Sequence, residues 1–320
     1  MTYQPPVRDH MFLLRDVLNI EQYGNLPAFA DASIDVVEQI VEGAAQFTGE
    51  VLAPLNSVGD KTGCKLDPVT NTVTTPPGFK EAYKALCEGG WTGLGSDPTY
   101  GGQGLPHVVN LAFSEMSSSA NMAFSMYPGL AHGAYSAIHT GGSDAQKQTY
   151  LPKMVTGEWT GTMNLTEPQA GSDLAALTTM ATPDGDGGWR ITGQKIFITW
   201  GDHDATDNII HLVLARLPDA PKGPKGISLF LAPKFLVKDD GSLGERNAFR
   251  PVGVEHKLGI HASPTCVMAY EGAGAELVGR PNEGLAHMFV MMNAARLAVG
   301  VEGVGIAERA YQHEIGRAHV

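Results

Sequence analysis

The sequence has few cysteines and few basic residues for its length, and both shortages exclude classes of protein. Cysteine occurs three times in 320 residues, at Cys64, Cys87 and Cys266, with no metal-type spacing. This pattern predicts reduced, mostly buried thiols rather than a disulfide or a zinc site. The 22 basic residues are outnumbered by 34 acidic ones, and the formal charge of −12 argues against general binding to nucleic acid.

Long apolar runs are also missing. No window approaches the roughly 18 to 20 uninterrupted apolar residues of a membrane span. Arg8, Asp9 and Arg15 interrupt the N-terminal stretch, so it does not resemble a secretory signal. We therefore expect a soluble, cytoplasmic protein without membrane attachment. The 43% of hydrophobic residues is enough for a buried core, and the length indicates about two domains.

The first half of the chain has the apolar periodicity of helices. Between Ser33 and Leu52, apolar residues recur at three- and four-residue spacing until Pro54 ends the pattern. Similar segments, separated by breaks rich in glycine and proline, predict helices at residues 79–88, 108–118, 122–140 and 144–154. We expect a helical N-terminal domain over residues 1–159.

After about Thr160, short apolar runs bounded by turn residues replace the helical pattern. They predict strands at residues 189–200, 208–217, 226–231 and 265–270. The glycine- and aspartate-rich residues 184–188 suit a tight reversal before the first of these strands. We expect a central β domain over residues 160–275.

The helical period returns after Gly284. Residues 285–312 predict one long helix that packs against other helices, as the start of a C-terminal helical domain over residues 276–320. Gly300, Gly303 and Gly305 within it predict close helix packing. They do not form a phosphate-binding loop, because no strand precedes them and the spacing is reversed.

Two short segments carry most of the functional information. In residues 165–173, Leu-Thr-Glu-Pro-Gln-Ala-Gly-Ser-Asp, Pro168 removes a backbone donor and Gly171 permits unusual backbone angles. This predicts an irregular loop whose amides and hydroxyls can face a ligand. Residues 195–199, Lys-Ile-Phe-Ile-Thr, predict a strand on which Thr199 could help to hold a planar aromatic ring.

These segments resemble the paired flavin-contact segments of the acyl-CoA dehydrogenase family. Residues 100–104, 148–152 and 257–266 match the family in the same order along the chain. The opening nine residues and residues 201–204 resemble a bacterial subgroup whose members carry an extra C-terminal domain. The resemblance implies an α+β fold with an all-α N-terminal domain, a central β-barrel-like domain and the start of a C-terminal helical bundle.

The resemblance also implies a reaction, the FAD-dependent α,β-dehydrogenation of an acyl-CoA thioester to a trans-2-enoyl-CoA. No side chain accepts a hydride reversibly, so the reaction requires a redox cofactor. Electrons would pass to an electron-transfer flavoprotein, and the family implies a homo-oligomer. Two alternatives stay open: an acyl-CoA oxidase that uses oxygen, and a flavin-binding relative without dehydrogenase activity, for example one that protects nucleic acid.

By resemblance, the candidate FAD-binding residues are Met163, Leu165, Thr166, Ser172, Phe197, Ile198 and Thr199. The Thr166 hydroxyl would hydrogen-bond the pyrimidine end of the flavin, and Thr199 would lie near the nitrogen that accepts the hydride. Phe197 stands where the family more often has tryptophan, and it can still stack. Ser172 would touch the diphosphate and the thioester tail of the substrate.

Asn293 and Arg296 are the other candidate substrate-binding residues. Arg296 matches an arginine near the family's active site, and a guanidinium on a mostly apolar helix would need a partner if it were buried. Asn293 stands where some members have aspartate. His261 replaces an arginine of the family motif and is expected to be exposed or structural. Within the 165–173 loop, the acidic side chains are expected to satisfy loop amides rather than to act as the base.

The resemblance places the base on a glutamate, either late in the C-terminal domain or immediately before the arginine that matches Arg296. Here that earlier position is Ala295. We therefore expect the base beyond Val320 and expect this chain to be an inactive fragment. Residues 315–320 depart from the family and match the translation of a common sequencing adapter, which predicts that they are not native. A natural divergent tail is the alternative.

Overall fold

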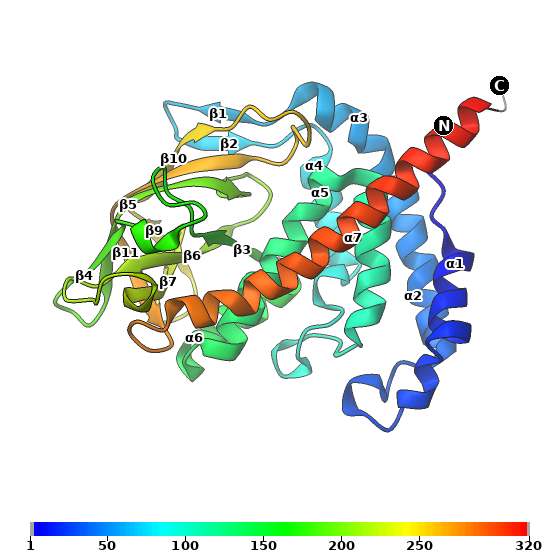
Figure 1. Ribbon diagram of the computed structural model, residues 1–320, viewed down its shortest axis with the longest axis horizontal. Helices are drawn as coiled ribbons and strands as arrows, with labels where there is room; N and C mark the ends of the chain where they lie inside the picture. Colours follow the sequence, from blue (N-terminus) through cyan, green and yellow to red (C-terminus); the bar gives the residue numbers. More distant parts are fainter. Residues whose placement is uncertain (1–2, 319–320) are drawn as a thin grey trace.

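A helical layer packs against a β domain, and one long helix runs along both (Figure 1). The computed structural model describes residues 3–318, with side chains described up to residue 315. Three-residue to six-residue helical turns fill the connections: η1 (Phe12–Val17), η2 (Ile20–Tyr23), η3 (Pro27–Phe29), η4 (Thr48–Leu52), η5 (Trp91–Gly93), η6 (Pro98–Tyr100), η7 (Leu174–Ala176) and η8 (Pro224–Gly226).

Each helix that the periodicity predicts in the first half is present, but the helices at Val7–Met11 and Ala53–Thr62 were not predicted. The second of these forms because the helical path continues past Pro54. The helices of this half are α1 (Val7–Met11), α2 (Ile34–Phe47), α3 (Ala53–Thr62), α4 (Phe79–Glu88), α5 (His107–Gly141) and α6 (Asp144–Thr156). The helix α5 joins two predicted helices across a kink at Asn121, whose φ is −158° and ψ is 87°. The Asn121 side chain accepts a hydrogen bond from the Phe124 amide, so it caps the second part of the helix.

A small hairpin interrupts the helical half, and the sequence pattern did not predict it. Its strands are β1 (Lys65–Asp67) and β2 (Thr72–Thr74), which pair antiparallel. The Asp67 carboxylate accepts hydrogen bonds from the Val69 and Thr70 amides and so stabilises the turn. Strands of three residues are too short to produce a recognisable alternation of apolar and polar side chains.

The strands of the β domain are β3 (Trp159–Asn164), β4 (Met180–Pro183), β5 (Trp189–Thr199), β6 (Asn208–Arg216), β7 (Ile227–Pro233), β10 (Phe249–Val254) and β11 (Thr265–Val278). Neighbours follow the order β10-β11-β5-β4-β6-β3, and β7 pairs with both β11 and β6. This last pairing closes a ring of strands, which confirms the barrel-like domain. A separate hairpin is formed by β8 (Phe235–Val237) and β9 (Leu243–Arg246).

The long helix α7 (Gly284–Ala318) packs mainly along α5 (Figure 1). A Cβ on Gly305 would lie 3.0 Å from the Glu115 carbonyl oxygen, which confirms close packing at that glycine. A Cβ on Gly300 or Gly303 would meet no other part of the protein within 4 Å, so the prediction of close packing was wrong for these two glycines. The predicted non-native segment is helical as far as Ala318, and residues 319 and 320 lie outside the described residues.

Much of the apolar surface of α7 is exposed. By length and composition this helix could cross a membrane, since one window has a mean hydropathy of 1.4, yet only 11% of that window is buried. Counting uninterrupted apolar runs did not reveal it, because single polar residues are scattered among its alanines and glycines. One such helix is weak evidence for a membrane span.

Candidate functional site

The two segments singled out from the sequence lie in contact at one edge of the β domain. The Ile196 amide of β5 donates to the Thr166 carbonyl oxygen at 2.9 Å. The Thr162 hydroxyl of β3 donates to the Thr199 carbonyl oxygen at 2.7 Å. The loop of residues 165–173 and the end of β5 therefore form one continuous structure.

A buried ion pair joins these segments from the inside. The Lys195 ammonium lies 2.8 Å from a Glu167 carboxylate oxygen and 3.0 Å from the Leu165 carbonyl oxygen. The side chains are only 0% and 2% exposed, respectively. No role for Lys195 was inferred from the sequence. The sequence feature that could have identified Lys195 is its place on the same strand face as the buried Ile191. A lysine on an inward face requires a buried partner.

Lys195 and Glu167 shift each other's pKa in opposite directions. Burial alone would raise the pKa of Glu167, but Lys195 and hydrogen bonds from Lys195, Thr179 and Thr178 outweigh burial and lower this pKa to about 2. Burial lowers the pKa of Lys195 to about 8, although Glu167 opposes this shift. Both groups are charged at neutral pH.

The acidic side chains of the loop serve its backbone. Glu167 accepts hydrogen bonds from the Thr178 amide at 2.7 Å and the Thr179 amide at 3.0 Å. Asp173 accepts one from the Ala175 amide at 2.9 Å. These contacts confirm that both carboxylates satisfy loop amides, as expected from the sequence.

A bulge at the end of β5 turns an aromatic side chain outward. The register with β11 shifts between the pairs Ile198–Cys266 and Lys195–Met268. Phe197 has a φ of 58°, which is uncommon for an aromatic residue, and it is 59% exposed. The regular alternation predicted here was therefore wrong. Ile198 is 1% exposed in the core, so only its backbone is available to a ligand.

The two segments carry three candidate hydroxyl groups. Ser172 is exposed, and Thr166 and Thr199 are partly exposed. Among residues 3–318, none of these hydroxyls has a hydrogen-bond partner. A Cβ on Gly171 would lie 3.8 Å from the Thr166 methyl carbon, so the loop folds back on itself at this point. Met163 is partly buried, and Leu165, the first residue of the loop, is buried.

The residues predicted on the long helix form a separate group. Arg296 donates to the Asn293 side-chain oxygen at 2.9 Å, and its guanidinium lies 5.2 Å from the Phe289 ring. Both Arg296 and Asn293 are exposed, so the arginine needs no buried partner. In the described part of the chain, no hydrogen bond or ion pair links either residue to the 165–173 loop.

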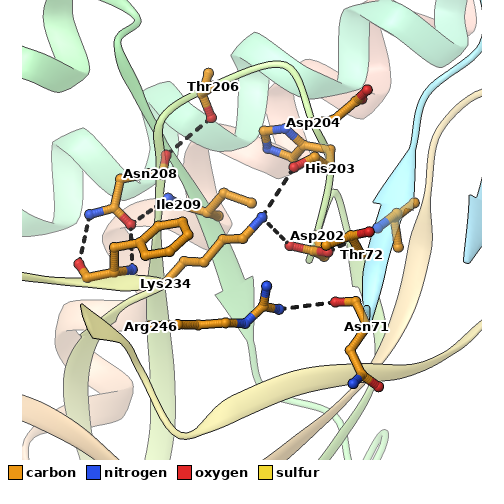
Figure 2. Close-up of polar contacts among 12 residues, drawn as sticks. Asn71, Thr72, Asp202, His203, Asp204, Thr206, Asn208, Ile209, Lys234 and Arg246 are labelled. Atoms are coloured by element: carbon orange, nitrogen blue, oxygen red, sulfur yellow. Dashed lines mark hydrogen bonds and ion pairs between the residues drawn. The ribbon is translucent and has the colours of Figure 1, made fainter. Parts of the chain in front are cut away.

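A second buried lysine–carboxylate pair lies elsewhere in the β domain (Figure 2). Lys234 contacts Asp202 at 2.5 Å and the His203 carbonyl oxygen at 3.2 Å. Asp202 in turn accepts a hydrogen bond from the Val73 amide of the β1–β2 hairpin at 3.0 Å. Residues 201–204 thus attach the hairpin to the β domain.

The other polar residues noted in the sequence are structural. His203 is buried between Tyr127 and Thr160, and burial lowers its pKa well below the usual value. His261 pairs with Asp60 at 2.9 Å, which confirms a structural role. The three cysteines are free, and only Cys266 is fully buried. The described residues contain no cluster of three or more histidine, cysteine or acidic side chains able to hold a metal.

Comparisons with known proteins agree with this arrangement. Residues 35–158 match the acyl-CoA dehydrogenase N-terminal domain, and residues 162–273 match its middle domain. The chain is 49% identical over 318 residues to 3-methylmercaptopropionyl-CoA dehydrogenase of Ruegeria pomeroyi, covering 99% of this chain and 54% of that protein. The chain thus spans about half the length of the curated relatives it matches.

Solved structures share the fold. Butyryl-CoA dehydrogenase from Megasphaera elsdenii superposes with a TM-score of 0.71 at 26% identity, over 86% of this chain and 67% of that one. A chain in the structure of the electron transferring flavoprotein of Acidaminococcus fermentans gives 0.71 at 28%, over 86% and 66%. The family uses FAD and comprises oxidoreductases that act on CH–CH groups. The predicted α+β fold is confirmed, and the chain belongs to the acyl-CoA dehydrogenase family.

Proposed function

We propose that the protein takes part in FAD-dependent α,β-dehydrogenation of an acyl-CoA thioester to a trans-2-enoyl-CoA. The observation that carries this proposal is the hydrogen-bonded junction of the loop and β5, where Phe197 is exposed and the Thr166, Ser172 and Thr199 hydroxyls have no partner among residues 3–318. An exposed aromatic ring and free donors suit a planar cofactor with polar edges. When bound, FAD supplies the hydride acceptor that no side chain can provide.

The roles of the candidate residues are those that the family resemblance implies. The Thr166 hydroxyl donates to the pyrimidine end of the flavin, Thr199 lies near the nitrogen that accepts the hydride, Phe197 packs against the ring, and Met163 and Leu165 line the cofactor. Ile198 contributes through its backbone. Ser172, exposed on the loop, contacts the diphosphate and the thioester tail.

The substrate's anionic coenzyme A portion is assigned to the exposed pair on α7. Arg296 presents a guanidinium held by Asn293, and such a group binds phosphate through charge-assisted hydrogen bonds. This assignment accommodates the chain's net charge of −12, because local charge determines whether an anion binds.

The α-proton base is assigned to a group outside residues 1–320. The family position before Arg296 is Ala295, which has no carboxylate. The Glu167 carboxylate is already paired with Lys195 and accepts hydrogen bonds from loop amides, so it is not assigned as the base. We expect the 320-residue chain to bind FAD without turning over acyl-CoA. Measurable dehydrogenation by these residues alone would overturn this assignment.

The proposal includes an electron acceptor, an oligomeric state and candidate acyl groups. Electrons leave through an electron-transfer flavoprotein, which the similarity to a chain from the Acidaminococcus fermentans structure supports. The protein acts as a homo-oligomer in cytoplasmic fatty acid metabolism. The nearest chemical candidates for the acyl group are butyryl and 3-methylmercaptopropionyl, since similar proteins are named for them.

The test has a binding arm and a turnover arm. FAD titration of the chain, followed by flavin fluorescence, should show saturable binding that Thr166→Val and Phe197→Ala weaken, whereas exposed Lys80→Met on α4 does not. The complete reading frame should bleach its flavin with one of the acyl-CoA esters. Peroxide formation without an added acceptor would instead identify an oxidase, and no bleaching with any ester would favour a non-dehydrogenase relative.

A further inference from the structure

The Lys195–Glu167 pair bonds directly to backbone groups at the start of the candidate flavin loop, residues 165–173, and beyond its end. The Lys195 ammonium donates to the carbonyl oxygen of Leu165. In a planar trans peptide the carbonyl and the following N–H point in opposite directions. Holding the Leu165 carbonyl towards the buried Lys195 ammonium therefore points the Thr166 amide away from that ammonium.

The carboxylate at the other end of the pair secures the far side of the same loop. Glu167 accepts the Thr178 and Thr179 amides, so one carboxylate links the start of the loop to residues that follow it. The segment in between carries Ser172. One ion pair thus determines how both ends of this segment meet the β domain.

Resting on the function proposed above, we propose that Lys195 and Glu167 are positioning residues for the flavin. They orient the Leu165–Thr166 peptide so that the Thr166 amide and hydroxyl donate to the cofactor. Donors fixed in this way favour the negative charge that gathers on the flavin when it is reduced. Loss of the pair should therefore weaken FAD binding and make the reduction potential of the bound flavin more negative.

Stability and positioning can be separated by replacing both members with apolar residues. A buried ion pair exchanged for well-packed apolar side chains often leaves stability unchanged or improved. Lys195→Met with Glu167→Leu removes both charges together, so it should cost less stability than removing one charge alone, but methionine cannot donate to the Leu165 carbonyl and leucine cannot accept the loop amides. We expect the affinity for FAD to fall about tenfold, the loss typical of one or two hydrogen bonds.

The chain contains a matched control in the second buried pair. Lys234→Met with Asp202→Leu removes the same chemistry at the β1–β2 hairpin (Figure 2). Urea unfolding of the apo chains would compare stability, fluorescence titration would give the Kd for FAD, and equilibration with a reference dye would give the potential. Only the variant at Lys195 and Glu167 should show weaker binding and a more negative potential.

The outcomes distinguish this inference from the proposed function. If the unmodified chain binds no FAD, the proposed function fails and this inference with it. If the unmodified chain binds FAD and the Lys195/Glu167 variant matches it in Kd and potential, only the positioning role is overturned. Equal losses in both double variants would also overturn it, because the effect would then be general.

A single substitution that keeps side-chain hydrogen bonds to the loop provides a second test if the double variant does not fold. Glu167→Gln retains a side-chain oxygen for the loop amides while removing the charge. It should weaken FAD binding in the same direction but by less than the double variant. Amide hydrogen exchange at Ile196, whose N–H bonds the Thr166 carbonyl, should accelerate in proportion. Unchanged binding together with faster exchange would contradict the inference.

Discussion

The two buried lysine–carboxylate pairs of the β domain have the same chemistry but secure different parts of the chain. Lys195 and Glu167 join segments within the candidate site, through a carbonyl oxygen and loop amides. Lys234 and Asp202 hold the β1–β2 hairpin, which belongs to the helical half, against the β domain. A buried ion pair therefore does not mark a functional site by itself. The backbone groups that it holds determine its role.

The largest expected effect comes from breaking one pair on one side only. Lys195→Met leaves the Glu167 charge buried without a partner, so the free energy of unfolding should fall by about 3–5 kcal/mol. Lys234→Met should cost a comparable amount, because Asp202 is also only 2% exposed. Urea unfolding monitored by tryptophan fluorescence measures both, with exposed Lys80→Met as the control. A loss below about 1 kcal/mol for Lys195→Met would contradict the structure.

Acid should weaken the Lys195–Glu167 pair. Glu167 has its pKa lowered from 4.5 to about 2, so its contribution is complete above pH 4.5 and is lost as the pH falls towards 2. At about 1.4 kcal/mol per pH unit, this loss is on the order of 3 kcal/mol. Urea unfolding at several pH values would follow it. The Lys195→Met/Glu167→Leu variant should lack this component, and an identical acid response in that variant would assign the loss to other groups.

The same comparison explains what the sequence could and could not predict. Helices such as α4 were located to the residue, because their apolar period is complete within one segment. The ion pair joins residues 28 positions apart, and only the fold shows that they meet. The bulge at Phe197 depends on the register with β11, which no local pattern specifies.

The predicted site residues also differ in how well the sequence alone could place them, depending on whether a local motif identifies them. The loop and strand segments could be assigned together because each carries a recognisable motif, and they proved to be hydrogen-bonded. Arg296 was harder to assess, since its apolar neighbours along α7 suggested burial, whereas the helix exposes that face. Amphipathic patterns indicate which face is apolar, but they do not indicate what covers it.

The strand β3 offers a finer test, because neighbouring threonines serve the two regions. Thr162 donates to the Thr199 carbonyl at the candidate site, and Thr160 contacts His203 near the hairpin. Replacing either with valine should cost about 1–2 kcal/mol, since each change leaves a buried partner unsatisfied. FAD titration should show weaker binding for Thr162→Val only. Equal weakening by Thr160→Val would remove the distinction between the regions.

The smallest expected effect on stability is at Arg246, which bonds the β1–β2 hairpin at the protein surface. Arg246 donates to the Asn71 carbonyl oxygen at 3.0 Å near the Lys234 pair (Figure 2), and this contact is exposed to solvent. Water replaces much of an exposed hydrogen bond, so Arg246→Ala should lower the free energy of unfolding by about 0.5 kcal/mol or less. Faster amide exchange confined to residues 65–74 would show that the arginine holds the hairpin while the buried pair maintains the domain contact. A loss as large as that of Lys234→Met would instead mean that the hairpin is attached mainly from its surface, and the buried pair would no longer explain the contact between the helical half and the β domain.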